Sequence, residues 1–160
     1  MTKGHDVTII VTGDDVMRIN TRFPVAVHAL AVIALISETT TTSELIANSV
    51  NTNPVVIRRI NAMLKKADLI TIKPGVGGAT LNRSAKDITL LDVYNAVKSS
   101  EDELLFDFHC NPNEKCFIGA NINEALSQPL IAAQKSLEDT LKNYTLHDVL
   151  EKIRDKYKKV

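Results

Sequence analysis

The segment NPVVIRRINAMLKKADLITIKPGVGGATLN, residues 53–82, constrains the fold most, because its pattern changes from helical to hairpin within a few residues. Asn53 followed by Pro54 is a strong helix start, since the Asn side chain can accept a free N–H and Pro supplies a helical φ. Apolar residues then recur at three- and four-residue intervals: Val56, Ile57, Ile60, Met63, Leu64 and Ala67. The glycines of PGVGG suit a tight turn between two short β-prone runs. The segment therefore predicts a helix followed by a two-stranded hairpin.

Two helical segments precede this unit. The first begins at Thr21 and shows apolar residues at helical spacing through Leu35. The second is short and follows the tract TTTTS, where Thr41 and Glu44 have the spacing of a capping box. Helix, helix, short turn, helix and hairpin is the order of a winged helix-turn-helix. We expect a mainly α fold with a small β wing.

The charge distribution is uneven, although the net charge is zero. Residues 17–86 contain nine basic and three acidic residues, a local balance of +6, whereas residues 101–128 contain six carboxylates and one lysine. A chain polarised in this way can hold one face against a polyanion such as double-stranded DNA. Charge alone leaves ordinary solvated helix faces as an equal alternative.

Beyond residue 121 an apolar stripe predicts one amphipathic helix of about twenty residues. Its members are Ile122, Leu126, Leu130, Ala133, Leu137 and Leu141. We expect this helix to form a homodimer; the alternative is that it folds back on its own subunit. The expected divisions are an N-terminal extension without assigned role (1–16), the winged helix-turn-helix domain (17–100), a linker loop with both cysteines (101–121) and a helical dimerisation region (122–160).

Several classes of protein are disfavoured. No apolar run approaches the roughly 20 residues of a membrane span, and charge interrupts the opening MTKGHDVTIIVTGDD, so we expect a cytoplasmic protein without membrane contact. Two cysteines are too few for a disulfide scaffold. Cys110 next to His109 lacks a supporting acid or oxyanion motif, so we expect no enzyme and assign no catalytic residue, metal or cofactor.

The chain resembles the Rrf-two family of bacterial transcription regulators, also called BadM or IscR-like. The matching pieces are MRINTRFPVAVHALAVIAL, TSELIANSVNTNPVVIRRINAMLKKADLI, PGVGGATLNRSAKDITLLDVYNAV and HCNPNEKCFIGANI, and the resemblance covers residues 17–156. It implies a homodimeric winged-helix repressor or activator whose third helix enters the major groove of a roughly palindromic site. The sequence does not identify the effector.

The chain departs from the family pattern in three places. Asp68 stands where members usually have Gly after the recognition helix, and Ala79 stands where an aromatic residue often follows the paired wing glycines. In the iron–sulfur branch three cysteines recur at six-residue intervals; Cys110 and Cys116 match the first two, but Ile122 occupies the third place. Two thiolates and a neighbouring histidine leave one iron position unfilled, so the chain looks more like the branch without clusters.

The candidate DNA-binding residues fall into three groups. Arg58 and Arg59 are expected to carry much of the contact, one of them reading a guanine edge. At the helix entrance, Thr52, Asn53 and Val55 are expected to lie near bases or phosphates. From the first helix and the wing, Arg22, Lys73 and Arg83 are expected to contact the sugar-phosphate backbone. The alternative for Arg59 is a cap or ion pair within its own subunit.

Cys116 is the candidate redox-sensing residue, because Lys115 beside it could lower the pKa of the thiol. The resemblance points the same way, since some members of the branch without clusters sense oxidants through the cysteine at this position. Cys110 is its candidate partner, and a buried, inert thiol is the alternative. For the whole protein, the alternative to specific DNA binding is a winged-helix dimer that acts mainly through protein partners.

Overall fold

The computed structural model describes residues 19–36, 41–73, 78–98, 105–106 and 108–158. Its elements, in chain order, are α1 (Ile19–Leu35), α2 (Ser43–Val50), α3 (Pro54–Lys66), β1 (Ile70–Ile72), β2 (Ala79–Leu81), the 3-10 helix η1 (Ala85–Asp87), α4 (Leu90–Ala96), α5 (Phe117–Lys142) and α6 (Leu146–Tyr157). The expected mainly α fold with a small β wing is confirmed. The N-terminal extension 1–16 lies outside the described residues.

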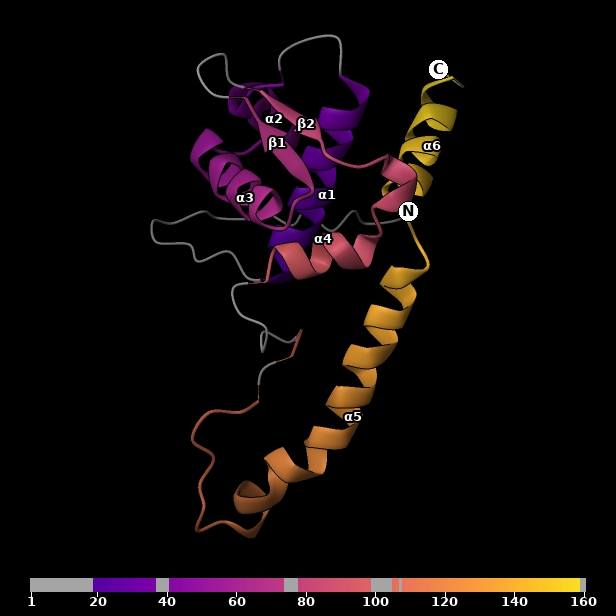
Figure 1. Ribbon diagram of the computed structural model, residues 1–160. Coiled ribbons are helices and arrows are strands. Elements are labelled where there is room, and N and C mark those ends of the chain that lie inside the picture. The colour runs from indigo at the N-terminus through magenta and orange to yellow at the C-terminus, as the bar shows by residue number, and fades with distance from the viewer. Residues whose placement is uncertain (1–18, 37–40, 74–77, 99–104, 107, 159–160) are drawn as a thin grey trace, which may run out of the picture.

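Helix α1 is the centre of the folded unit: it packs against α2, α3, α4, α6 and β2 (Figure 1). Its residues Ala26, Leu30 and Ile33 are buried, as are Ile57 and Leu64 of α3. Burial of each Leu or Ile side chain among them contributes about 1.5–3 kcal/mol. This core fixes where the helix-turn-helix and the wing lie.

Two helix starts differ from the sequence expectation. Helix α1 already includes Ile19, so it starts before Thr21 and Pro24 lies inside it. Helix α2 is capped by Thr42, whose hydroxyl accepts the Leu45 N–H, and not by Thr41. Thr41 is buried, and its carbonyl accepts the N–H of Ala79 at the start of β2. Thr41 thus contacts the wing from outside the helix, and α2 starts one residue later than its spacing suggested.

The wing is an antiparallel pair with the register Ile70↔Leu81, Thr71↔Thr80 and Ile72↔Ala79. Ile70 and Ala79 are buried, whereas Thr71 and Thr80 are exposed, which is the alternation of a strand pair with one face on a core. The turn residues 74–77 lie outside the described residues. The core side of the wing is therefore fixed by burial, and its other side is free to meet a partner.

Helix α6 belongs to the same core as α1–α4. Leu146 and Leu150 are buried, and the Leu146 N–H donates to the Ile88 carbonyl at 2.8 Å. A capping box of Thr145 and Asp148 starts the helix. Within the region 122–160 that we expect to form the dimer, the Leu146 and Leu150 side of α6 therefore packs on its own subunit.

Helix α5 begins at Phe117, five residues before the expected start at Ile122, and has 26 residues. Gly119 in the first turn is a poor helix former and hid this start in the sequence. The helix runs away from the winged unit, so that its N-terminal half stands apart from the other helices (Figure 1). None of the helices in the described parts of the chain qualifies as a membrane span.

Candidate nucleic-acid interface

The turn between α2 and α3 is built by its backbone. Asn51 adopts left-handed φ and ψ of 57° and 53°, and the N–H groups of Asn51 and Thr52 bond back to carbonyls of α2. This is a Schellman ending, in which a residue with positive φ satisfies the last carbonyls of a helix. Asn53 then caps α3, because its Oδ1 accepts the Val55 N–H at 2.8 Å. The capping role expected for Asn53 is confirmed.

The outer face of α3 is basic. Ile57, Ile60, Asn61 and Leu64 are buried, and this places the opposite face of the helix at the surface. The exposed residues are Val55, Arg58, Arg59, Ala62, Lys65 and Lys66. No acidic residue lies in the first turn of α3, and both lysines lie in its last turn. The face therefore offers a row of cations on a rigid helix.

Arg58 is held by an ion pair that the sequence did not reveal. Its Nη2 donates to Oε1 of Glu44 on α2 at 2.6 Å, and both side chains stay more than half exposed. A hydrogen bond from the Glu44 backbone, followed by the bond from Arg58, lowers the pKa of the Glu44 carboxyl. The intrasubunit pairing considered for Arg59 thus falls on Arg58, while Arg59 is exposed.

The wing supplies Lys73, and the segment after it supplies Arg83. Lys73 is exposed directly after β1, and its backbone N–H donates to the Gly78 carbonyl at 3.1 Å. Arg83 is also exposed, but its Nη1 lies 3.4 Å from the Asp87 carbonyl and 3.9 Å from Oδ2 of Asp92. Arg83 is therefore turned partly toward the start of α4.

Arg22 does not lie where the sequence suggested. Its side chain is buried in α1, with 4% of the residue exposed. From the sequence we expect Arg22 on the first helix to contact the sugar-phosphate backbone, whereas basic residues are seldom this buried. In the fold, position 22 faces inward, so Arg22 cannot reach a duplex that lies against α3 without a change in this packing.

Both cysteines are free and exposed. Cys116 is the N-cap of α5, and although its thiol makes no capping hydrogen bond, the N–H groups of Gly119 and Ile118 favour the thiolate. These N–H groups lower the pKa of the Cys116 thiol. The cause is thus the start of a helix and not the neighbouring Lys115 on which the sequence argument depended.

The loop before Cys116 is fixed to α5. Asn123 Nδ2 donates to the His109 carbonyl at 3.0 Å, and the Cys116 N–H donates to the Asn113 carbonyl at 3.0 Å. Gly119 lies so close to this same carbonyl that a Cβ at position 119 would collide with it. Gly119 is therefore needed for a close approach, which explains why a poor helix former stands in the first turn.

The expected dimerisation residues divide into two groups. Leu137 and Leu141 pack against the core of their own subunit, whereas Leu126 is 41% exposed and Ala133 is exposed. Ile122 and Leu130 are half-buried. The stripe did not include three apolar residues that are more exposed than Leu126, namely Phe117 (85%), Ile118 (69%) and Ile131 (59%).

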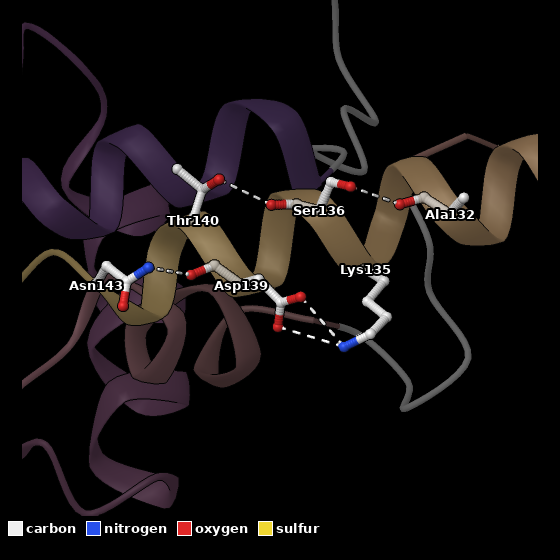
Figure 2. A network of polar contacts seen from close by, with 6 residues as sticks. All are labelled: Ala132, Lys135, Ser136, Asp139, Thr140 and Asn143. Carbon is white, nitrogen blue, oxygen red and sulfur yellow. Dashed lines mark hydrogen bonds and ion pairs between the residues drawn. The ribbon is translucent and has the colours of Figure 1, made fainter.

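The last turns of α5 carry polar residues whose groups are satisfied within the helix (Figure 2). The hydroxyls of Ser136 and Thr140 donate to the carbonyls four residues before them, and Lys135 pairs with Asp139 at 3.1 Å. Groups that already have partners gain little from a second chain. The apolar positions are therefore the ones on α5 that favour association.

Comparison with known proteins finds transcriptional regulators and a DNA-binding protein among the relatives of this chain. The Rrf2 family model, described as "Iron-dependent Transcriptional regulator", matches residues 19–152. Over 132 residues the chain is 46% identical to a protein named as an HTH-type transcriptional regulator, YwnA of Bacillus subtilis (strain 168), covering 82% of this chain and 96% of that one. A crystal structure described as that of a DNA binding protein is 41% identical, with a TM-score of 0.64, covering 81% of this chain and 98% of that one. A transcriptional regulator of Lactobacillus plantarum is 26% identical, with a TM-score of 0.68, covering 83% and 89%.

The residues present do not fit an iron site. Two exposed thiols are available, and the half-buried Ile122 stands at the place of a third cysteine. Among the described residues, no three His, Cys, Asp or Glu side chains are grouped so that they could hold a metal ion. We therefore derive no step through iron.

The Cys116 thiol should titrate at a lower pH in the folded protein than in the unfolded one. The N–H groups that stabilise its thiolate are aligned only while α5 is formed. In a Cys110→Ser background, the rate of iodoacetamide alkylation should rise at a lower pH for native protein than for protein in urea. Equal midpoints in the two states would contradict this assignment.

Proposed function

The chain belongs to the Rrf2 family of transcriptional regulators, and from this premise we propose that it binds DNA sequence-specifically as a homodimeric repressor on a palindromic operator. The basic outer face of α3 carries the proposal. In this arrangement α3 lies in the major groove, which is wide enough for a helix, and presents Arg59 and Arg58 to base edges. Occupation of a promoter by such a dimer excludes polymerase and thereby represses transcription.

The residues around α3 supply the contacts that orient it. Thr52, Asn53 and Val55 lie at its entrance, where backbone N–H groups favour phosphate. Lys73 contacts the sugar-phosphate backbone from the wing, and Arg83 joins it after release from Asp92. Arg22 is left out of this interface, because it is buried.

The proposed homodimer is supported by the two-fold symmetry that a palindromic site would require and by the exposed apolar residues of α5. A pair of α3 helices must lie about one turn of DNA apart, which requires a scaffold that joins the subunits. The exposed Leu126, Ile131 and Ile118 provide apolar area on an element that stands away from the DNA-binding unit. Burial of these side chains between two copies stabilises the dimer.

Redox control through Cys116 is the third part of the proposal. Its lowered thiol pKa raises the fraction of thiolate, which is the species that attacks a peroxide. The thiolate takes one oxygen atom to give a sulfenate, and the peroxide leaves as water or alcohol; condensation with the Cys110 thiol then gives a disulfide and releases water. The partner thiol belongs to the same subunit or to the other one. Either product changes the start of α5 and hence the scaffold.

Replacing Arg59 by Ala should weaken binding to the protein's own upstream region by about 1–3 kcal/mol, the typical value of a base-reading pair. The matched control is Arg154→Ala, which removes the same charge from α6, on another side of the molecule (Figure 1). Its effect should stay within about 0.5 kcal/mol. A gel-shift titration at fixed salt measures both. Losses below about 1 kcal/mol for both Arg58→Ala and Arg59→Ala would sink the assignment and favour a dimer acting through protein partners.

The protein should sediment at about twice its subunit mass of 17.6 kDa. Leu126→Glu places a charge in the proposed apolar interface and should shift the equilibrium toward monomer, because an unpaired charge is costly to bury. Ser136→Glu adds the same charge at an exposed polar position of α5 beyond Gln134, where the helix is joined to its own subunit, and should leave the dimer intact. Sedimentation equilibrium at micromolar concentration distinguishes them. A monomeric wild type, or equal disruption by both variants, would refute dimerisation through the exposed apolar residues of α5.

Mild peroxide treatment should change the operator affinity of wild-type protein and leave Cys116→Ser unchanged. The serine keeps the shape of the side chain but cannot form a sulfenate or a disulfide. The measurement is a footprint before and after oxidation, followed by reduction to restore the first pattern. An unchanged wild-type footprint, with both thiols still titratable, would eliminate the switch.

A further inference from the structure

Asp68 stands between the recognition helix and the wing in an unusual backbone conformation. Its φ is 56°, in the left-handed region that favours glycine. The Asp68 N–H donates to the Lys65 carbonyl, and the Leu69 N–H donates to the Leu64 carbonyl, each at 3.0 Å. These two bonds are those of a Schellman motif, with Asp68 at the position where Gly is usual. Backbone geometry alone would thus be served better by glycine.

The side chain of Asp68 does something that glycine could not do. Asn82 Nδ2, directly after β2, donates to Asp68 Oδ1 at 2.6 Å. The hydroxyl of Thr71, in the middle of β1, donates to Asn82 Oδ1 at 2.5 Å. The Asn82 N–H also donates to the Leu69 carbonyl at 3.0 Å. A chain of hydrogen bonds therefore runs from the end of α3 across both strands of the wing.

This chain lies on the side of the wing that the core does not hold. Ile70 and Ala79 anchor the inner side by burial, whereas Asp68, Thr71 and Asn82 are all exposed. Lys73 follows Thr71 by two residues, so it lies on the same side of the strand. The polar chain and the cation proposed to contact the DNA backbone thus belong to one side of one hairpin.

We propose that Asp68 is a positioning residue for DNA binding: through Asn82 and Thr71 it fixes the angle of the wing relative to α3, so that Lys73 meets the DNA backbone when α3 lies in the groove. This inference rests on the proposed DNA-binding function. A wing held in its bound position before binding loses less conformational freedom on complex formation, and affinity rises accordingly. The contribution comes from the oxygen of Asp68 as an acceptor, because its negative charge itself repels phosphate.

The test compares two neutral variants, Asp68→Asn and Asp68→Gly. Both remove the same charge and both tolerate a left-handed backbone, but only Asn keeps an oxygen that accepts from Asn82. Operator affinity of Asp68→Gly should be roughly 2- to 10-fold lower than that of Asp68→Asn, the range of one net hydrogen bond. Affinity is measured well below the melting temperatures of both variants, so that weaker binding is not a consequence of unfolding.

A second comparison separates positioning from a general structural role. In a Lys73→Ala background the difference in affinity between Asp68→Asn and Asp68→Gly should vanish, because the contact that the wing delivers is gone. In an Arg59→Ala background the difference should persist, since Arg59 lies on α3. A purely structural role of Asp68 would give the same difference in both backgrounds, and that result would overturn the inference.

Hydrogen exchange in the absence of DNA gives an independent readout. The Lys73 and Asn82 amides, which bond within the hairpin, should exchange faster in Asp68→Gly than in Asp68→Asn. Equal exchange, or equal affinity of the two variants for operator DNA, would refute the positioning role while leaving the proposed function intact. A wild-type protein without specific DNA binding would instead refute the proposed function and the positioning role together, whatever the exchange rates.

Discussion

Burial of one face of α3 is the interaction on which the rest of the structure depends. Ile57, Ile60 and Leu64 lie in the core with α1, and this burial fixes the rotation of α3 about its own axis. Arg58 and Arg59 must then point outward. Neighbouring cations on one face repel each other, so the charges themselves do not favour this arrangement. Apolar packing imposes it, and the basic surface is the consequence.

Residues with positive φ end both helices of the helix-turn-helix. Asn51 closes α2 before the turn, and Asp68 closes α3 before the wing; their φ values are 57° and 56°. Asn and Asp accept this region more readily than other residues with a Cβ. Each also frees the following residue to bond back to its helix, through the N–H groups of Thr52 and Leu69. The helix therefore has a defined start, a defined end and a defined relation to the hairpin.

Periodicity and capping signals in the sequence were sufficient to predict the helix-turn-helix and the wing, because these elements depend mainly on residues that are neighbours along the chain. The pair of Glu44 with Arg58 joins two helices, and no local pattern indicates it. Arg22 was misplaced for the same reason, since only the fold decides that this basic residue is buried. The start of α5 was missed because glycine is a poor helix former, and the sequence does not show that the Asn113 carbonyl requires glycine at position 119.

Gln134 shows how α5 is joined to the winged unit, and why its two halves differ. The residue is 7% exposed; its Nε2 donates to Tyr94 Oη at 3.1 Å and to Glu138 Oε1 at 2.8 Å, and its Oε1 accepts the Leu105 N–H at 3.1 Å. Rotation of α5 would break the bonds to Tyr94 and Leu105, and the loss of the buried one to Tyr94 would cost about 1–3 kcal/mol. The part of α5 from Gln134 onward is therefore bound to its own subunit, and the part before it carries the exposed apolar residues that we propose to meet another chain. The segment before Cys116 contacts α5 at both ends, through the Leu105 N–H and through Cys116, which caps the helix. A change at the thiol therefore acts first on α5, the helix proposed to form the dimer interface.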